Sequence, residues 1–249
     1  MKTIYTFLIP FVLITAVSCT DNDSDTPSAA GMATEEAAEI VGTSLASSSA
    51  GLTGMTSEVA ETSNESATSS QNSVSEFTQD STLSWTNQTG SPISFNAQVA
   101  YTYETSCDQF NLPEAFAYEL TYSSSFDGPR MASSNSGGSS WTLSKLNNFY
   151  TSFELNGTYT RSGTWESKIF NKSTTSASAT FTLDGLILDL PSESITGGTA
   201  TYTLTGIGPQ GSPYSFEGSI VFIDQGKATI SIQGRTFMVD LESGEITEI

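Results

Sequence analysis

The chain has 249 residues, with 8 Lys and Arg against 27 Asp and Glu, no His, and a net charge of −19 at pH 7. The absence of histidine excludes Ser-His-Asp and Cys-His catalysis, His-ligated zinc and a histidine pH switch. No Lys or Arg occurs between Thr3 and Pro129, so nucleic acids would repel this chain and we expect no nucleic-acid partner. No motif indicates a cofactor.

Residues 1–18 have the composition of a secretory signal. Lys2 precedes an apolar stretch over residues 4–17, which is too short to cross a bilayer as a helix. The sequence AVSC, ending at Cys19, resembles a bacterial lipobox, in which a small residue precedes a cysteine that is acylated and becomes the new N-terminus. The resemblance implies a lipoprotein held on the membrane by acyl chains on Cys19. The alternatives are an ordinary cleaved signal with an unrelated cysteine, and an uncleaved anchor.

Residues 19–33 form an acidic tether. Asp21, Asp23 and Asp25 resemble the acidic stretch that follows the lipid-bearing cysteine in Bacteroidota lipoproteins sent to the cell surface. The resemblance implies an outer-membrane protein exposed on the surface, with an inward-facing periplasmic lipoprotein as the alternative. The same spacing opens a calcium loop, but Thr26 and Met32 stand where that loop needs Gly and Glu, so no metal site is predicted.

Residues 34–61 are predicted to form one amphipathic helix, with Thr34 as a candidate N-cap. Its apolar face repeats at intervals of three and four residues, with Gly51 and Gly54 as weak points. The apolar residues are Ala37, Val41, Leu45, Leu52, Met55 and Val59. Because the polar face carries no Lys or Arg, we expect the helix to pack on the following sheet and not on a membrane surface.

Residues 62–82 are rich in Ser and Thr and are predicted to be a linker. The sequence DST over residues 80–82 resembles the O-glycosylation site of secreted proteins from the same phylum, which implies a glycan on Ser81. A plain polar cluster is the alternative.

Residues 83–249 show the alternation of apolar and polar residues that is typical of strands. Turn signals lie at Asp127-Gly128, Asn156-Gly157, Gly197-Gly198, Gln225-Gly226, Gln233-Gly234 and Ser243-Gly244. Without a helical period between them, these strands predict a mainly β fold: an antiparallel meander curled into a half-barrel, a barrel or a sandwich, with the N-terminal helix packed on it. The polar segment 123–141 is expected to be a long loop.

The last hairpins, GKATISIQGRTFMVDLESGEI over residues 226–246, are similar to the C-termini of poorly characterised β-rich lipoproteins of Bacteroidota. The chain is therefore suspected to be a lipoprotein of the signal-peptidase-II type from such an uncharacterised family. The resemblance implies no activity.

Few side chains are candidates for a site. Trp85, Trp141 and Trp165 would form a stacking platform for a sugar if exposed, or part of the core if buried. Once Cys19 is acylated, Cys107 has no intramolecular partner, and it is expected to be buried, with intermolecular pairing as the alternative.

The expected function is that of a lipid-anchored envelope protein with a non-catalytic binding or structural role. Its partners would be the membrane, through Cys19, and a glycan, a lipid-like ligand or an envelope protein. One alternative is a periplasmic carrier that holds a lipid-like ligand between a half-barrel and its covering helix. A glycoside hydrolase, the other alternative, would need a carboxylate pair, for which Asp184 with Asp189 and Asp240 with Glu242 are candidates.

Overall fold

The structure is a computed structural model that describes residues 32–69, 78–86, 92–110, 113–145, 151–170 and 173–249. The predicted signal, Cys19 and the tether up to residue 31 lie outside the described residues. Side chains are not described for residues 65–69, 78–81, 83 and 85.

Helices come first in the described chain and are followed by strands. The elements are α1 (Thr34–Leu45), the 3₁₀ turn η1 (Ser47–Ser49), α2 (Leu52–Ser69), β1 (Thr78–Thr86), β2 (Ser94–Cys107), β3 (Pro113–Asp127), β4 (Met131–Ser144), β5 (Ser152–Ser167), β6 (Thr174–Asp189), β7 (Ser194–Ile207), β8 (Pro213–Ile223), β9 (Lys227–Ile232), β10 (Arg235–Asp240) and β11 (Ile246–Glu248). Each strand pairs antiparallel with the next, so all of them form one meander sheet. The predicted mainly β meander with an N-terminal helix is confirmed.

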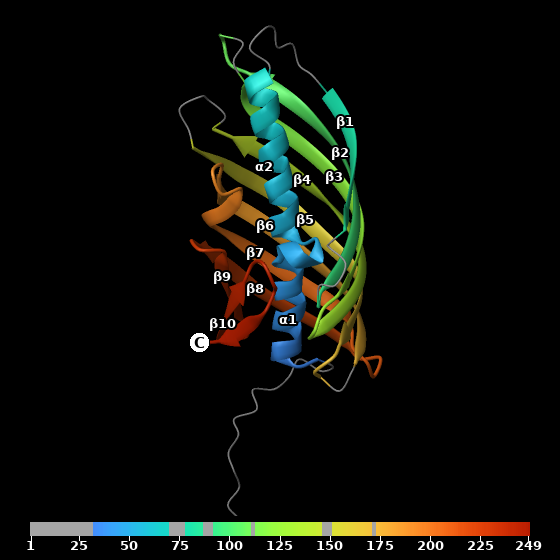
Figure 1. The fold of residues 1–249 in the computed structure, drawn as a ribbon. Helices are drawn as coiled ribbons and strands as arrows, with labels where there is room; N and C mark the ends of the chain where they lie inside the picture. The colour runs from blue at the N-terminus through green and yellow to red at the C-terminus, as the bar shows by residue number, and fades with distance from the viewer. Residues whose placement is uncertain (1–31, 70–77, 87–91, 111–112, 146–150, 171–172) are drawn as a thin grey trace, which may run out of the picture.

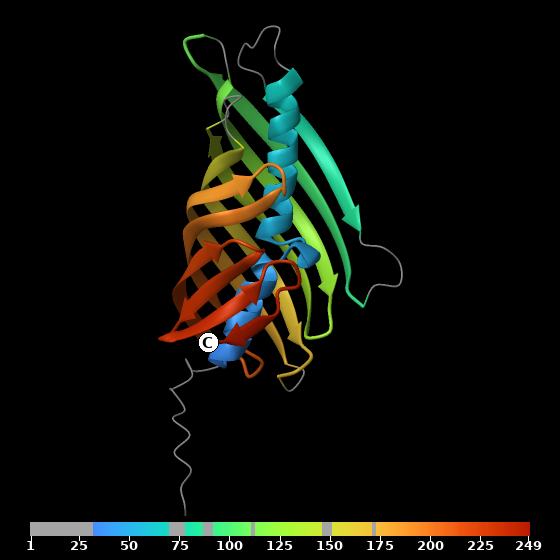
Figure 2. The same cartoon turned by 60° about the vertical axis from the view of Figure 1, so that its left-hand side comes forward.

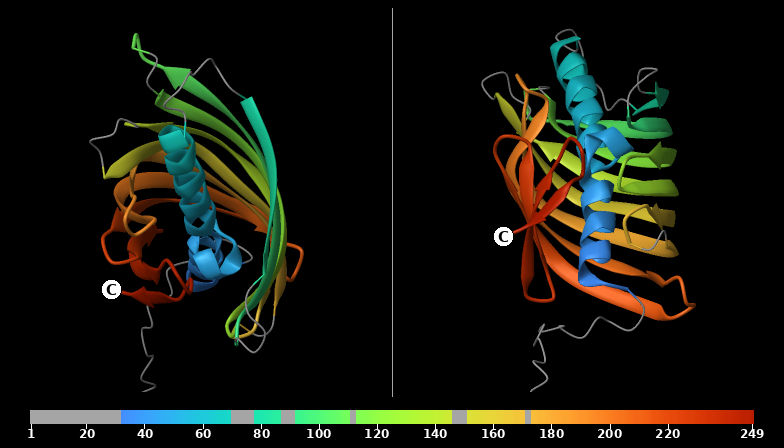
Figure 3. Two further views of the ribbon diagram at one scale, coloured as in Figure 1. Left: turned by 45° about the horizontal axis from the view of Figure 1, so that its top comes forward. Right: turned by 60° about the horizontal axis from the view of Figure 1, so that its bottom comes forward.

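The sheet curls without closing. In the described residues β1 pairs with β2 and β11 with β10, and these two end strands do not pair with each other. Both helices lie along the concave face, with α1 beside the last strands and α2 beside the middle ones (Figures 1 and 3). Of the three predicted forms the half-barrel is right. The closed barrel and the two-layer sandwich are wrong, because the helices occupy the space that a second β layer would fill.

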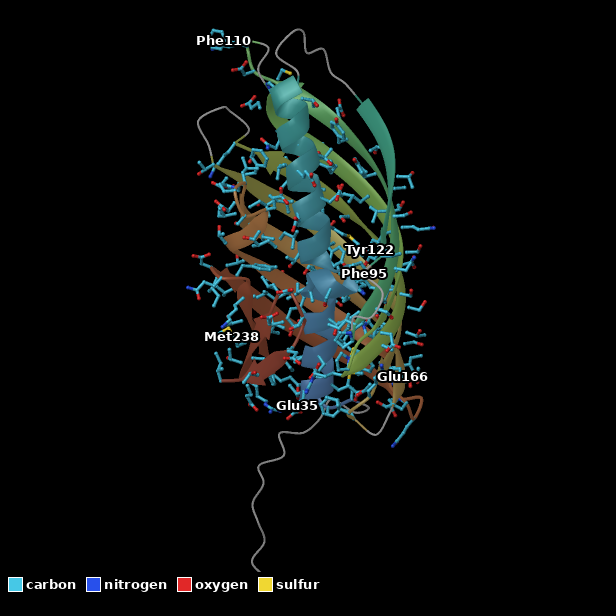
Figure 4. All side chains as sticks on the ribbon, in the orientation of Figure 1. Glu35, Phe95, Phe110, Tyr122, Glu166 and Met238 are labelled. Carbon is cyan, nitrogen blue, oxygen red and sulfur yellow. The ribbon has the colours of Figure 1, made fainter. Side chains whose placement is uncertain are left out.

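Strand side chains alternate between a buried concave face and an exposed convex face, as a period of two requires. On the concave face three tyrosines stand directly opposite a glycine of a neighbouring strand: Tyr122 (labelled in Figure 4) and Gly137, Tyr202 and Gly218, and Tyr214 and Gly206. A Cβ on Gly218 would lie 2.0 Å from the Ser231 carbonyl oxygen and 2.5 Å from the Tyr202 hydroxyl. The missing side chains therefore make room for the rings as the sheet bends.

The predicted turn dipeptides that contain glycine are of two kinds: some form hairpin turns, and others lie inside strands. The predicted turns at Gln225-Gly226 and Gln233-Gly234 are confirmed, and φ is positive at all four residues. Gln233-Gly234 is a two-residue hairpin turn, whereas Gln225-Gly226 ends a three-residue turn that begins at Asp224. Asn156-Gly157 and Gly197-Gly198 were predicted as turns, and that prediction is wrong, because they lie inside β5 and β7 beside shifts in strand register. Such local bulges bend a strand without ending it.

The predicted single helix over residues 34–61 is two helices. The chain leaves helical geometry at Ala46, and Ala50 takes a left-handed conformation with φ of 53°. A Cβ at Gly51 would lie 2.6 Å from the Ala46 carbonyl oxygen, so this tight junction requires glycine. Thr34 does not act as the N-cap, since α1 begins at this residue and its hydroxyl donates to Gln233 Oε1 at 2.8 Å.

The predicted linker over residues 62–82 is also wrong for most of its described part. Helix α2 continues to Ser69, and β1 begins at Thr78, before the predicted strand boundary at Leu83. The composition predicted a linker because Ser and Thr are common in linkers, but these side chains can also be buried when they have a hydrogen-bond partner in the core. Ser63 is fully buried, with its Oγ 2.7 Å from the Tyr118 hydroxyl. Residues 70–77 lie outside the described residues.

The predicted long loop over residues 123–141 is a hairpin. Strand β3 ends at Asp127, β4 begins at Met131, and the Gly128 amide donates to the Met131 carbonyl at 2.9 Å across the turn. The segment is poor in large apolar residues but still alternates, with Ser124, Ser133, Asn135 and Ser139 buried. The alternation persists because small polar residues fit under the covering helix.

Helix α1 is fastened to the sheet through its acids. Glu39 forms an ion pair with Arg130, whose Nε donates at 2.8 Å, and Glu35 accepts from Arg235 at 2.5 Å. Ser173 donates to Glu36 at 2.6 Å. The last strands fold over the same helix, which brings the C-terminus close to the start of α1 (Figure 2). Every residue of α1 except Glu35 is buried.

Candidate functional site

The structure does not describe the side chains of the candidate residues for lipidation and glycosylation. Cys19 is outside the described residues, so its acylation stays a prediction. Ser81 and Trp85 lie in β1, where their backbones pair with Tyr101 and Ala97 of β2, and their side chains are not described. Cys107 lies at the end of β2 and is half-buried, so the prediction that it is buried is wrong.

Trp141 and Trp165 do not form an exposed sugar platform. They are 2% and 0% exposed and belong to the core between the sheet and the helices. Both lie on the concave face of their strands, and the indole Nε1 of each has no hydrogen-bond partner among the described residues. The prediction of aromatic ligand contacts by an exposed surface is therefore wrong for these two, because the strand alternation turns them inward.

The interior beneath α2 has an aromatic wall, made by Tyr101 and Tyr103 of β2 and Phe116 and Tyr118 of β3. The rings of Tyr103 and Tyr118 stack with centroids 5.2 Å apart. Helix α2 reaches this wall through Ser63 on Tyr118 and through Thr62, whose Oγ1 is 3.5 Å from the Tyr101 hydroxyl. These two polar contacts join α2 to the aromatic wall.

Interior tyrosines are poor acid–base groups at neutral pH. Burial raises the pKa of four hydroxyls above their usual range, those of Tyr118, Tyr122, Tyr202 and Tyr214. The hydrogen bond to Ser63 lowers the pKa of Tyr118 without offsetting burial. All four hydroxyls stay protonated, so they serve as hydrogen-bond donors and acceptors inside the fold.

Arg161 is a buried base that the sequence analysis did not identify. It is 0% exposed, and its NH2 donates to the Ser49 carbonyl at 3.0 Å. When the Asn135 amide is turned so that its oxygen faces the guanidinium, this oxygen accepts from Nε at 3.1 Å. Among the described residues no carboxylate pairs with it, and its NH1 has no partner. The bond to the Ser49 carbonyl ties β5 to η1, which gives Arg161 a structural role. Its position in alternation with Tyr159 and Trp165 was the signal that it points inward.

The convex face is an array of hydroxyl side chains, here called the convex hydroxyl face. Strand register aligns them in rows that cross β2 to β8, and two neighbouring rows show the pattern. One row is Thr102, Glu119, Ser140, Thr158, Thr182, Thr201 and Ser219, and the next is Ala100, Thr121, Gly138, Thr160, Thr180, Thr203 and Glu217. Strands β2 to β8 hold one base, the buried Arg161. The face is therefore polar, neutral to acidic, and free of cations.

The convex hydroxyl face is hollowed over β1 to β3, at a place here called the outer hollow. Its volume is about 470 Å³, and its lining residues are Thr82, Ala100, Tyr101, Thr102, Glu119, Leu120 and Thr121. The exposed members are those on the convex side, whereas Tyr101 and Leu120 have inward side chains. Ser140 donates to Glu119 Oε1 at 2.6 Å and so holds this carboxylate in place. No local sequence motif marks the outer hollow, because register between strands brings its members together.

The carboxylate pairs considered for hydrolysis have local structural roles. Asp240 Oδ1 accepts from the amide of Ser243 at 2.8 Å, and Asp189 Oδ2 accepts from the hydroxyl of Ser192 at 2.6 Å. These are turn contacts in which a short acid caps the backbone that follows it. Asp184 lies exposed on β6, and Glu242 lies exposed in the turn after β10. The bonds favour a structural role for both pairs.

A buried carboxylate lies elsewhere, at Glu39. Burial raises its pKa, against the hydrogen bond and the charge of Arg130, while nearby Glu245 adds to the rise. The pair borders a small cavity of about 50 Å³ between α1, the β3–β4 turn and the β10–β11 turn. This volume suits water better than a ligand, so the pair is treated as part of the fastening of α1.

Comparison with known protein families, curated proteins and solved structures finds no match to this chain. Within the described ranges, no group of three or more Cys, Asp or Glu side chains could hold a metal ion. None of the helices in that part of the chain is long and apolar enough to cross a membrane.

Proposed function

We propose that the chain is a lipid-anchored cell-envelope lipoprotein of the Bacteroidota type with a non-catalytic binding role. Cys19 carries the acyl chains, the acidic residues that follow it direct the protein to the cell surface, and the sheet domain binds a partner through its convex hydroxyl face. Two acyl chains are enough for stable anchoring, so the domain itself needs no apolar membrane contact.

The observation that carries the binding role is the occupation of the concave face by α1. Eleven of its twelve residues are buried, among them Ala37, Ile40 and Leu45 at 0% exposure. Ion pairs from Glu35 and Glu39 and backbone bonds from η1 to Leu241 and Glu242 hold it there. A helix fixed in this way leaves the convex hydroxyl face as the broad surface available to a partner.

Cell fractionation and protease shaving test the proposal. In cells labelled with a fatty acid, the wild-type protein should take up label and sediment with the outer membrane, and Cys19→Ser should do neither. With an epitope tag after Ile249, proteinase K added to intact cells should remove the signal. An unlabelled wild-type protein, or a form released into the medium, would contradict lipid anchoring. Protection of the tag would replace the surface orientation with the periplasmic one.

A second candidate function, a periplasmic carrier of a lipid-like ligand, is favoured by the aromatic wall beneath α2. Helix α2 would have to move away from the aromatic wall to admit a ligand. A bifunctional thiol cross-linker between Ser63→Cys and Tyr118→Cys would hold α2 on β3; the Tyr118 ring spans the gap between the two backbones, so a spacer is needed in place of a direct disulfide. A carrier would co-purify with lipid visible by native mass spectrometry, and the cross-linked variant would take up none. Equal lipid content in the cross-linked and untreated variant would exclude this function.

A further inference from the structure

We infer that the outer hollow is a binding site for a neutral saccharide. The inference deepens the proposed function, since it rests on the binding role of the convex hydroxyl face and names the class of ligand. The volume of about 470 Å³ falls in the range of roughly 300–1,000 Å³ that is usual for ligand sites.

Hydrogen-bonding chemistry in the outer hollow suits a ligand with many hydroxyls. Thr82, Thr102 and Thr121 are exposed there, and each hydroxyl can donate one hydrogen bond and accept others. Glu119 adds a carboxylate that only accepts when ionised, so a ligand must offer it an O–H or N–H group. Ser140 already holds one oxygen of Glu119, which leaves the other oxygen for the ligand.

The lining of the outer hollow exposes more apolar than polar surface, and the outward-facing part of it belongs to small groups. Ala100 faces outward between Thr82 and Thr121 in strand register, and its short side chain deepens the surface at that point. Its methyl group and those of the threonines offer a thin apolar floor for the C–H face of a sugar ring. A flat aromatic or long aliphatic ligand would leave the hydroxyls and the carboxylate desolvated without partners, which is unfavourable.

Charge selects a neutral ligand over an acidic one. Strands β1 to β8 offer no exposed Lys or Arg among the described residues, and the whole chain has a net charge of −19. Glu104 and Glu119 on β2 and β3 add local negative charge close to the site. Uronic-acid or sulfated polysaccharides would therefore meet repulsion without a compensating cation. Neutral hexose or pentose units meet none.

Native affinity electrophoresis tests this inference on the mature lipoprotein. The protein is purified in a polyoxyethylene detergent, which has no sugar head group, and its acidity drives it through the gel. Gels contain dextran, mannan or xylan as neutral polysaccharides, or alginate as an acidic one. We expect retardation that grows with the concentration of at least one neutral polysaccharide, and none with alginate.

Two matched variants locate the site. Thr102→Val with Thr121→Val removes two hydroxyls of the outer hollow and keeps side-chain shape and strand preference. Thr229→Val with Thr247→Val makes the same exchange on β9 and β11, outside the convex hydroxyl face. From the usual worth of a hydrogen bond, the first variant should bind at least about tenfold more weakly, and the second should match the wild type.

Several results would overturn the inference: no retardation by any of the three neutral polysaccharides, equal weakening in both variants, or equal retardation by alginate. Near-ultraviolet circular dichroism of each variant shows whether a loss of binding comes from a loss of fold. Failure here is distinct from failure of lipid anchoring, because the labelling of Cys19 and the shaving assay are measured independently.

Discussion

Replacing Arg130 with methionine tests how α1 is fastened to the sheet. Glu39 is 3% exposed and its partner Arg130 is 40% exposed, so the two partners would respond differently to loss of the pair. If Glu39 were lost, the Arg130 side chain could still be solvated by water. If Arg130 is lost, Glu39 is left buried as an uncompensated charge close to Glu245. Removing one partner of a buried pair is strongly destabilising for this reason.

Protonation of Glu39 limits how much unfolding free energy the Arg130→Met variant can lose. A carboxyl with an unfolded pKa of 4.5 can escape its charge at pH 7 by binding a proton, at a cost of about 3.4 kcal/mol from 1.36 kcal/mol per pH unit. At pH 5 the same escape costs about 0.7 kcal/mol. We therefore expect Arg130→Met to lower the free energy of unfolding by about 2–3 kcal/mol at pH 7 and by roughly 2 kcal/mol less at pH 5.

The sign follows from proton linkage. In the Arg130→Met variant, Glu39 holds a proton more readily in the folded state than in the unfolded state, so its stability rises as the pH falls toward 4.5. Urea unfolding of wild type and variant at pH 7 and pH 5 measures the difference. Lys168→Met is the control, because Lys168 pairs with Asp127, which is 61% exposed, and it should lose less than about 1 kcal/mol at either pH. An equal loss at both pH values for Arg130→Met would refute the reasoning.

Three further outcomes are expected. Leu45→Ala, at 0% exposure beneath the sheet, should lower the free energy of unfolding by about 2–5 kcal/mol in urea, and a loss under 1 kcal/mol would mean that α1 does not fill the core. Gly218→Ala should cost about 2 kcal/mol or more, because its Cβ would clash with the Ser231 carbonyl, whereas Gly197→Ala, also in a strand but with the nearest atom 3.7 Å from the new Cβ, should unfold close to wild type. In a spectrophotometric titration, Tyr118 and Tyr122 should stay un-ionised at pH 11 until the protein unfolds, and a full complement of phenolate in folded protein would contradict their burial.

The antiparallel pairing of consecutive strands could be predicted from the sequence. The ends of the helices and strands in the polar segments could not. The alternation from Leu83 onward marks strands that face a core on one side, and short turns such as Gln233-Gly234 force neighbouring strands to pair. Residues 62–82 and 123–141 were misread because serine and threonine are common in linkers. Burial of Ser63 and Ser139 depends on partners that lie far away in the chain.

Candidate sites were harder to predict than elements. A tryptophan in a strand faces either a partner or the core, and its position relative to neighbouring buried residues decides which. Trp165 shares its parity with Tyr159 and Arg161, all at 0% exposure, so a stricter reading of the alternation would have turned it inward. Thr102 and Thr121 carry no signal of their own, because they meet only through the pairing of β2 with β3 and their neighbours.

The sequence by itself determined the meander, the inward face of each strand and the apolar stripe that binds α1 and α2 to the sheet. These properties follow from periodicity and from turns that act over a few residues. Only the tertiary structure decided that the sheet stays open, that α1 occupies its concave face, that Arg161 lies buried, and that threonines of separate strands border one hollow. Curvature and register sum small twists and bulges over eleven strands, and no local window of sequence contains that sum.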